Sequence, residues 1–206
     1  MGEATKVTGA LNRCWWCGDD TEYVRYHDSE WGVPVVDDRR LFEKLSLEGF
    51  QSGLSWLTIL RKRPAFREVF ADFDPAMIAG FGARDVARLL KDARIVRHRG
   101  KIEAVISNAR SYAELAAREG SLAQFVWAYA PTRPITRVRR EDVPSQTAES
   151  TAMSKELRRR GWRFVGPTTA YAFFQAMGLV NDHLTRCFRY AELAGRRGAP
   201  ESGGSL

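Results

Sequence analysis

Thiols and imidazoles at opposite ends of the chain have the composition of a metal site. Cys14 and His27 are separated by twelve residues near the N-terminus, and His183 and Cys187 lie four residues apart near the C-terminus. A helical segment over residues 181–190 would project His183 and Cys187 from one face. Because two nitrogen and two sulfur ligands are a common set for structural zinc, the sequence predicts a Cys2His2 site that joins the two ends.

Cys17 leaves a choice of ligands open, because Cys14-Trp15-Trp16-Cys17 is also a C-x-x-C pair. A closed structural site takes four ligands, so one of the five candidates is spare. A catalytic zinc would instead keep an open coordination position, and that alternative predicts zinc-dependent hydrolysis. A further alternative is that these residues bind no metal, because an isolated cysteine or histidine is usually just packed.

Glu48 is the carboxylate with the most unusual position in the sequence. A helix is predicted after Asp37 and Asp38, and Leu41, Leu45 and Glu48 then fall at i, i+4 and i+7 on its apolar face. A carboxylate that faces a core needs a polar or cationic partner. The alternative is a glutamate near a strained helix end whose side chain turns to water.

Aromatic residues are dense before this helix, and one more follows it, so they could form the wall of a binding site. They are Trp15, Trp16, Tyr23, Tyr26 and Trp31 before the helix and Trp56 after it. They could equally pack beneath a loop with their polar tips hydrogen-bonded. Between the helix and Trp56, Gly53 allows a close approach of the backbone to another object, and Leu54 has the shape of a wedge.

The positive charge of the chain is concentrated in one segment. The formal net charge is +7, and residues 84–110 hold eight Arg or Lys against three Asp or Glu, a local excess of +5. This segment joins helices predicted over 83–92 and 101–118, which is the layout of a helix–hairpin–helix. Its phosphate-binding candidates are Arg97, Arg99, Gly100 and Lys101, with Gly100 permitting a tight turn. The alternative is an ordinary solvated turn.

The rest of the chain must form the helices that position these residues. Strand-like alternation is almost absent, and the sequence predicts an all-α protein. A break is expected at 61–64, with a new helix starting at Pro64. Further helices are predicted over 122–129, 152–160, 168–177 and 181–190, with a long connection over 131–150. Residues 1–12 are predicted to form a flexible leader and residues 191–206 a disordered tail.

Composition narrows the class of protein. Hydrophobic residues make up 44% and charged residues 28% of the 206 residues, as in a soluble globular protein. No apolar run reaches the roughly 20 residues of a membrane span. Three cysteines, an odd number, without an apolar leader indicate a reducing compartment, so we expect a cytoplasmic protein. The basic charge favours an anionic partner such as nucleic acid.

Six segments in order, together spanning roughly residues 13–188, resemble the bacterial 3-methyladenine DNA glycosylase I family. The segments are Arg13-Cys14-x-Trp16, Tyr26-His27-Asp28-x-Glu30-Trp31-Gly32, Leu47-Glu48-Gly49-x-Gln51-x-Gly53-Leu54-Ser55-Trp56, Ile95-x-Arg97-x-Arg99-x-Lys101-Ile102, Arg163-Phe164-Val165-Gly166 and Gly178-Leu179-Val180-Asn181-Asp182-His183. The resemblance implies a helix–hairpin–helix DNA glycosylase fold. It also implies a monomeric enzyme that removes 3-methyladenine, and 3-methylguanine, from double-stranded DNA and releases the free base.

The resemblance also implies roles for single residues. Its zinc ligands correspond to Cys14, His27, His183 and Cys187, which leaves Cys17 as the spare thiol. Its base pocket corresponds to Trp16, Tyr23, Tyr26, Glu48 and Trp56, and its plug into the DNA stack to Gly53 and Leu54. The implied domain covers 13–190, with a hairpin lobe over about 51–150 and a zinc lobe over about 13–50 and 151–190.

The chemistry of the implied substrate predicts how the pocket works. Methylation at N3 makes the purine cationic and weakens its glycosidic bond, so modest activation is enough. We expect Trp16 or Trp56 to stack on the cation, and Glu48, oriented by Tyr23 or Tyr26, to accept hydrogen bonds from it. Water then attacks the sugar carbon.

Some features depart from that family or leave another class of protein open. Relatives usually have glycine where this chain has Arg94, and Cys17 is an unexpected cysteine. No Asp occurs between Asp92 and Asp142, so the catalytic Asp of other helix–hairpin–helix glycosylases is missing, as expected for a monofunctional enzyme. The runner-up is a catalytically idle DNA- or lesion-binding protein with a structural zinc, which the presence of all the pocket residues disfavours.

Overall fold

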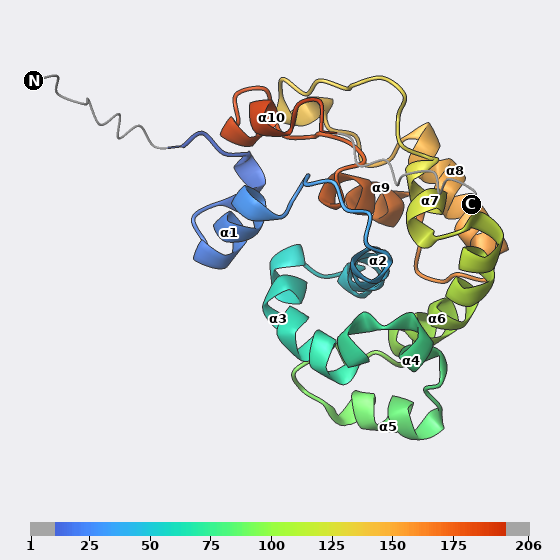
Figure 1. The fold of residues 1–206 in the computed structure, drawn as a ribbon. Helices are drawn as coiled ribbons and strands as arrows, with labels where there is room; N and C mark the ends of the chain where they lie inside the picture. Colours follow the sequence, from blue (N-terminus) through green and yellow to red (C-terminus); the bar gives the residue numbers. More distant parts are fainter. Residues whose placement is uncertain (1–10, 197–206) are drawn as a thin grey trace, which may run out of the picture.

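The computed structural model describes residues 11–196, and its architecture is helical (Figure 1). The α-helices are α1 (Thr21–Ser29), α2 (Asp38–Gln51), α3 (Trp56–Val69), α4 (Pro75–Ala79), α5 (Ala83–Lys91), α6 (Arg99–Glu119), α7 (Leu122–Trp127), α8 (Ala148–Arg159), α9 (Pro167–Ala176) and α10 (Phe188–Leu193). Three 3-10 turns are η1 (Trp15–Cys17), η2 (Ala71–Phe73) and η3 (Arg140–Asp142). Extended pairing over 11–196 is limited to one isolated bridge between Arg137 and Leu184, which confirms the all-α class.

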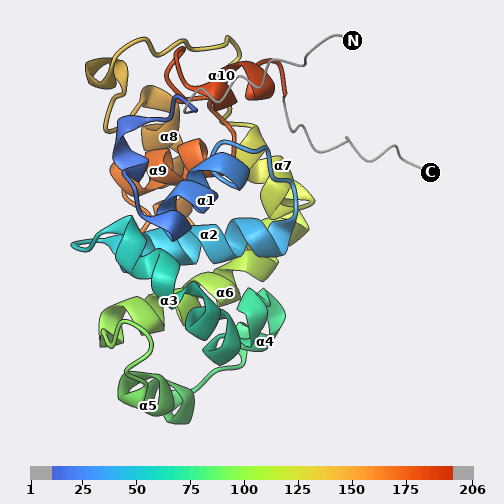
Figure 2. The same ribbon diagram turned by 90° about the vertical axis from the view of Figure 1, so that its left-hand side faces the viewer.

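Helix α2 crosses the middle of the molecule. The helices α3 to α6 lie on one side of it, and α7 to α10 lie on the other (Figures 1 and 2). The sequence begins this helix with two aspartates: the Asp37 side chain accepts from Arg40 N, while Asp38 accepts from the Tyr112 hydroxyl and from the N–H groups of α7. The start of α2 is therefore tied to both α6 and α7.

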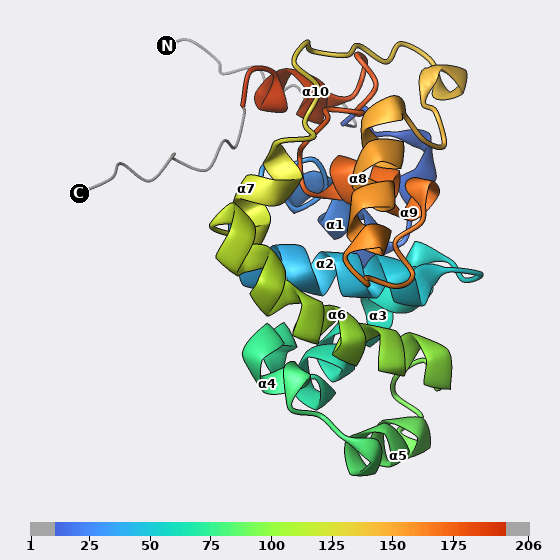
Figure 3. The ribbon, with the colours of Figure 1, turned by 90° about the vertical axis from the view of Figure 1, so that its right-hand side faces the viewer.

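Helix α6 is the longest helix and begins at the charged hairpin. It runs from the connection after α5 up to α7 (Figure 3). His98 caps its first turn, because the imidazole Nδ1 accepts from Lys101 N at 3.2 Å. The helix–turn–helix formed by α5 and α6 agrees with the layout predicted from the charge-rich segment.

The two ends of the described chain meet. Phe188 N donates to Asn12 O at 3.0 Å, and the segment after α9 packs against the loop after α1, where Val35 N donates to Met177 O. Gly178 has φ +75°, and a Cβ there would lie 2.5 Å from Pro34 N. One hydrophobic core extends from Cys14 to Cys187.

Three expectations about the elements were wrong. Pro64 lies inside α3, because the buried side of that helix continues on both sides of it, with Leu60 and Phe66 in the core. His183 and Cys187 lie in an irregular segment, since α10 starts only at Phe188. The tail was placed to start at residue 191, but α10 continues to Leu193, whose side chain is buried.

Residues 1–10 and 197–206, which include most of the expected leader and tail, lie outside the described residues. Within 11–196, the helices include none with an apolar stretch of the length that a membrane crossing requires.

Candidate functional site

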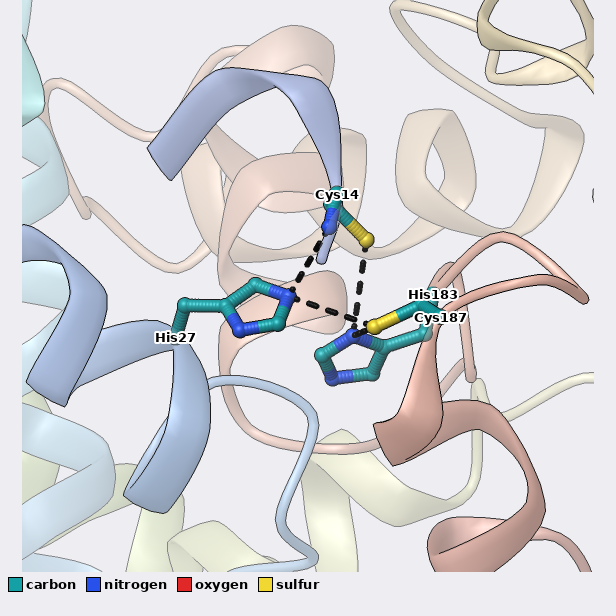
Figure 4. A group of neighbouring side chains, drawn as sticks. All are labelled: Cys14, His27, His183 and Cys187. Carbon is teal, nitrogen blue, oxygen red and sulfur yellow. Dashed lines mark hydrogen bonds between the residues drawn. The ribbon is translucent and has the colours of Figure 1, made fainter. Parts of the chain in front are cut away.

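The four predicted metal ligands converge at one buried point, although they come from opposite ends of the chain (Figure 4). The candidate ligand atoms of Cys14, His27, His183 and Cys187 all lie within 4.8 Å of one another. Both sulfurs lie 3.5 Å from Nδ1 of His183, and Cys187 Sγ lies 3.5 Å from Nε2 of His27. This Cys2His2 cluster could hold a metal ion, and its donor set fits a closed tetrahedral site.

The outward-facing nitrogens of both imidazoles have acceptors, so the inward nitrogens carry the lone pairs that a metal ion needs, and in this structure His27 Nε2 accepts from Cys14 N at 3.3 Å. His27 Nδ1 donates to Asp28 at 2.7 Å, and His183 Nε2 donates to the Trp31 carbonyl at 3.1 Å. Burial acts to raise the pKa of Asp28, but hydrogen bonds from Arg13 and His27 outweigh it, so the pKa lies below its usual value. Such supporting groups orient metal-binding histidines in known sites.

Cys17 lies outside the cluster. Its thiol donates to the carbonyl of Cys14 at 3.2 Å, so it supports the turn that carries Cys14 instead of joining the four ligands. The structure thus selects Cys14 from the C-x-x-C pair, because the 3-10 turn directs the two thiols differently.

A cavity of about 210 Å³ lies beside the cluster, and all of the predicted pocket residues line it. It is lined by Trp15, Trp16, Tyr23, Tyr26, Trp31, Lys44, Glu48, Gln51, Trp56, Val143, Ala172, Gln175 and Asp182. Glu48 is buried with a relative exposure of 6%. The expectation of a buried carboxylate is confirmed, and the alternative of a glutamate that turns to water is excluded.

Lys44 is a cavity residue that sequence analysis missed. Its Nζ lies 2.6 Å from Glu48 Oε1, 3.0 Å from the Tyr26 hydroxyl and 3.1 Å from the centroid of the Trp56 ring. The signal that could have found it is its position one helical turn before Glu48, on the same face of α2. Lys44 therefore stands between Tyr26 and Glu48, where direct orientation of the carboxylate by a tyrosine was expected.

Burial dominates the titration of the groups around Glu48. It lowers the pKa of Lys44, which the Glu48 carboxylate partly restores by direct attraction. Burial, reinforced by the charge of Glu48, raises the pKa of the Tyr26 hydroxyl. The Tyr23 hydroxyl also has a raised pKa, chiefly from burial. Both tyrosines are therefore neutral at neutral pH, and the Tyr26 hydroxyl accepts from Lys44 Nζ.

Aromatic contacts fix the walls of the cavity. The ring centroid of Trp16 lies 4.9 Å from that of Tyr23 and 5.0 Å from that of Trp31. It also lies 5.3 Å from the ring centroid of His27, which belongs to the metal cluster. Trp16 therefore connects the cluster to the cavity, so that the cluster can hold this wall in place.

The far wall of the cavity contains a second carboxylate. Asp182 is buried and accepts from the Tyr171 hydroxyl at 2.6 Å, from Gln175 at 3.0 Å and from Arg137 at 3.0 Å. No role for Asp182 was predicted from the sequence. These donors satisfy the buried carboxylate. Because Tyr171 and Gln175 belong to α9, Asp182 also holds α9 to the segment that carries His183.

The loop between α2 and α3 contains the predicted plug. Gly53 has φ +81°, which favours glycine, and Leu54 is 42% exposed at the tip of the loop. Lys101 holds the start of this loop, because its Nζ donates to Phe50 O at 2.9 Å and to Ser52 O at 2.5 Å.

The structure therefore places the Lys101 ammonium on backbone carbonyls and not at the surface where a phosphate would bind, and its assignment to phosphate binding stays a prediction. Its ammonium is buried because the last carbonyls of α2 have no partners within their own helix. Gly100 is helical and leaves room for the His98 ring, which a Cβ would approach to 3.2 Å, so it does not form the tight turn that was expected.

Two of the predicted hairpin cations face solvent. Arg97 and Arg99 are both exposed at the start of α6. Arg94, in contrast, is shared between Asp92 and Glu68, with its guanidinium 2.7 Å from each carboxylate. The unexpected arginine at the start of the hairpin is thus neutralised locally and fastens the hairpin to α3.

Comparisons with known proteins agree with this geometry. The family profile described as methyladenine glycosylase matches residues 16–190. DNA-3-methyladenine glycosylase 1 of Escherichia coli (strain K12) is 46% identical over 182 residues, covering 87% of this chain and 97% of that protein. A crystal structure of 3-methyladenine DNA glycosylase I superposes with a TM-score of 0.83 at 48% identity, covering 86% of this chain and 98% of that one. A structure of 3-methyladenine DNA glycosylase I from Staphylococcus aureus, described as the structural basis of its 3-methyladenine recognition, superposes with a TM-score of 0.82 at 39% identity. The match covers 87% of this chain and 96% of that one.

Sequence similarity over most of both chains and the same fold lead to one conclusion. This chain belongs to the methyladenine glycosylase family.

Proposed function

We propose that this protein is a DNA glycosylase that flips 3-methyladenine out of alkylated DNA and removes it by hydrolysis. The observation that carries the proposal is the buried Glu48 carboxylate in a cavity walled by Trp16, Tyr26 and Trp56. The similar proteins named above are 3-methyladenine glycosylases. By the same chemistry, 3-methylguanine is a second substrate.

The cavity suits a cationic base. A ring face attracts a cation more than a neutral base, and the Glu48 carboxylate adds negative potential. The methylated purine is itself a good leaving group, so the protein has to extrude it, hold it and admit water to the sugar carbon. No aspartate follows the hairpin before Asp142, and Lys101 is engaged with carbonyls, which supports a monofunctional enzyme without lyase activity.

The DNA surface is formed by the plug loop and the hairpin. We assign Gly53 and Leu54 to the gap left by the flipped base, and Arg97 and Arg99, with the N-terminus of α6, to the phosphate backbone. These contacts position the duplex without reading its sequence.

The Cys2His2 cluster is proposed to hold one structural zinc ion. Four protein ligands fill a tetrahedral shell, and so this site would leave no position for a reacting water. The ion would hold the chain ends, and through His27 also Trp16, beside the cavity.

Replacing Glu48 by glutamine tests the proposal. Glu48→Gln removes the charge at nearly constant shape, and the lost charged hydrogen bonds predict a fall of roughly 10- to 100-fold in release of 3-methyladenine from DNA. Zinc content should not fall, whereas the unfolding midpoint should fall, because Lys44 Nζ loses its buried ion-pair partner 2.6 Å away. Glu114→Gln, on the exposed side of α6, is the matched control. Equal activity of Glu48→Gln and wild type would remove Glu48 from the mechanism.

A further inference from the structure

The cavity already contains a cation, which is the ammonium group of Lys44. Its Nζ lies 2.6 Å from Glu48 Oε1 and 3.1 Å from the Trp56 ring centroid, with the Tyr26 ring centroid at 5.3 Å. The side chains of Lys44 and Glu48 are 7% and 5% exposed. Lys44 therefore uses the carboxylate that the cationic base is proposed to use and one of the two tryptophan rings on which the base is expected to stack.

The ammonium and the base cannot use these groups at once. Two cations on one ring face and one carboxylate would repel each other, and Lys44 Nζ already lies over the Trp56 ring at 3.1 Å from its centroid. The lysine stem is long and unbranched, so the ammonium can leave by rotation about its own side-chain bonds without movement of α2. Entry of a base is then an exchange of one cation for another.

The exchange is asymmetric across the reaction. A lesion in DNA enters as a cation and is attached to a duplex that is held by the plug loop and the hairpin, so the rest of the DNA can drive displacement of Lys44. After the glycosidic bond breaks, the base is neutral and is no longer attached to DNA. The Lys44 ammonium keeps its charge and regains both Glu48 and Trp56 when it returns.

We propose that Lys44 is a built-in competitor for the base site, which is displaced by the alkylated base and promotes release of the neutral product. This inference rests on the proposed function and deepens it. It accounts for a buried lysine in a binding cavity, where an apolar residue of the same length would fill the space without the cost of burying a charge.

Lys44→Met tests the inference by removing the charge while keeping the length and flexibility of the side chain. Binding of free 3-methyladenine at pH 8, followed by quenching of tryptophan fluorescence, should become at least about tenfold tighter than in the wild type, because no ion pair has to be broken. Lys155→Met, an exposed lysine of α8, is the control and should bind as the wild type does. In multiple-turnover excision, Lys44→Met should be inhibited by correspondingly lower concentrations of product.

Equal affinity of Lys44→Met and wild type would overturn the inference and leave Lys44 with a structural role. Weaker binding by Lys44→Met would also overturn it, because Lys44 would then assist the base. Failure of the wild type and the variant alike to bind 3-methyladenine would overturn the proposed function along with the inference.

A second measurement needs no variant, so it decides the question even if Lys44→Met fails to fold. A crystal structure of the wild-type protein with free 3-methyladenine should show the base against Trp56 and the Lys44 Nζ away from both Trp56 and Glu48. A bound base with the Lys44–Glu48 contact unchanged would contradict the inference.

Discussion

At the scale of single residues, the Glu48–Lys44 pair differs from the other ion pairs of the described chain in its depth and its surroundings. Most of the others involve at least one partly exposed side chain, whereas this pair is enclosed by rings. Buried pairs contribute little net stability, because desolvation offsets their attraction. The pair is therefore better explained by what the cavity binds than by what it adds to folding.

Replacing Trp56 should weaken binding of the alkylated base. Trp56→Leu keeps an apolar side chain but removes the ring face, and cation–π attraction of about 0.5–2 kcal/mol predicts a loss of roughly 2- to 30-fold in kcat/KM on alkylated DNA. Single-turnover excision at subsaturating enzyme measures this loss. Trp56→Phe, which retains a ring, should lose less, and identical losses in both variants would contradict a role for the ring face.

The helical spacing was sufficient to predict that Glu48 lies on the apolar face of its helix, whereas its aromatic neighbours were predicted from the family resemblance. The sequence was not sufficient for Lys44 or Lys101. A lysine stem can carry its ammonium outward or inward, and spacing does not reveal which. Lys44 turns inward to a carboxylate and Lys101 to unpaired carbonyls, and these partners are known only once α2 is placed.

At the scale of elements, the short loop between α2 and α3 is rigid at its base and exposed at its tip. Lys101 holds the base of the loop, and Leu54 presents its side chain to solvent. This arrangement suits a plug that enters DNA without losing its own shape.

Leu54→Ala should impair excision from DNA while leaving binding of the free base unchanged. The side chain packs on little of the protein, so the unfolding midpoint should also be unchanged, and excision from duplex DNA should fall several-fold. Comparing duplex excision with titration of free 3-methyladenine separates the two effects. Met77→Ala, another exposed apolar residue, is the control. A parallel loss of free-base binding would place Leu54 in the pocket instead.

Lys101 and the hairpin arginines should behave differently. Lys101→Met loses charged hydrogen bonds and should lower the free energy of unfolding by about 2 kcal/mol without changing the salt dependence of DNA binding. Arg97→Ala and Arg99→Ala should each reduce the slope of log K against log salt by about 1 and leave stability nearly unchanged. Denaturant unfolding and salt-dependent DNA titrations provide both readouts. A reduced slope in Lys101→Met would show that its ammonium reaches phosphate after all.

Most helices were predictable, because their apolar periodicity and capping residues are local signals. The exceptions depend on tertiary contacts. Pro64 interrupts one hydrogen bond of α3, but the packing of Leu60 and Phe66 on either side keeps the helix continuous. The segment that carries His183 and Cys187 has helical spacing, yet it is irregular. Its course is fixed by the loop after α1 and by the opposing ligands.

At the scale of the whole molecule, the Cys2His2 cluster closes the chain. Its ligands come from both ends, so a bound ion would link α1 to the segment before α10 (Figure 4). The pairing was predictable from composition, because two compact Cys and His groups are sufficient for four ligands. The sequence alone could not exclude Cys17 as a ligand, because that requires knowing where each thiol points in the structure.

Removing one ligand should release the metal and loosen the fold. Cys14→Ser should lose the single zinc per chain and lower the free energy of unfolding by about 3 kcal/mol or more, because metal binding is coupled to folding. Cys17→Ser should keep both zinc and stability, since its thiol lies outside the cluster. Mass spectrometry for zinc and urea unfolding report the two quantities. Loss of zinc in Cys17→Ser with retention in Cys14→Ser would reverse the ligand assignment.

The most direct measurement is incubation of the purified protein with methylated duplex DNA, followed by chromatographic and mass-spectrometric identification of the released bases. We expect free 3-methyladenine, intact DNA strands and no covalent adduct after borohydride treatment. Binding of the DNA without release of 3-methyladenine would contradict the proposed activity. A borohydride-trapped Lys101 adduct would contradict the hydrolytic mechanism.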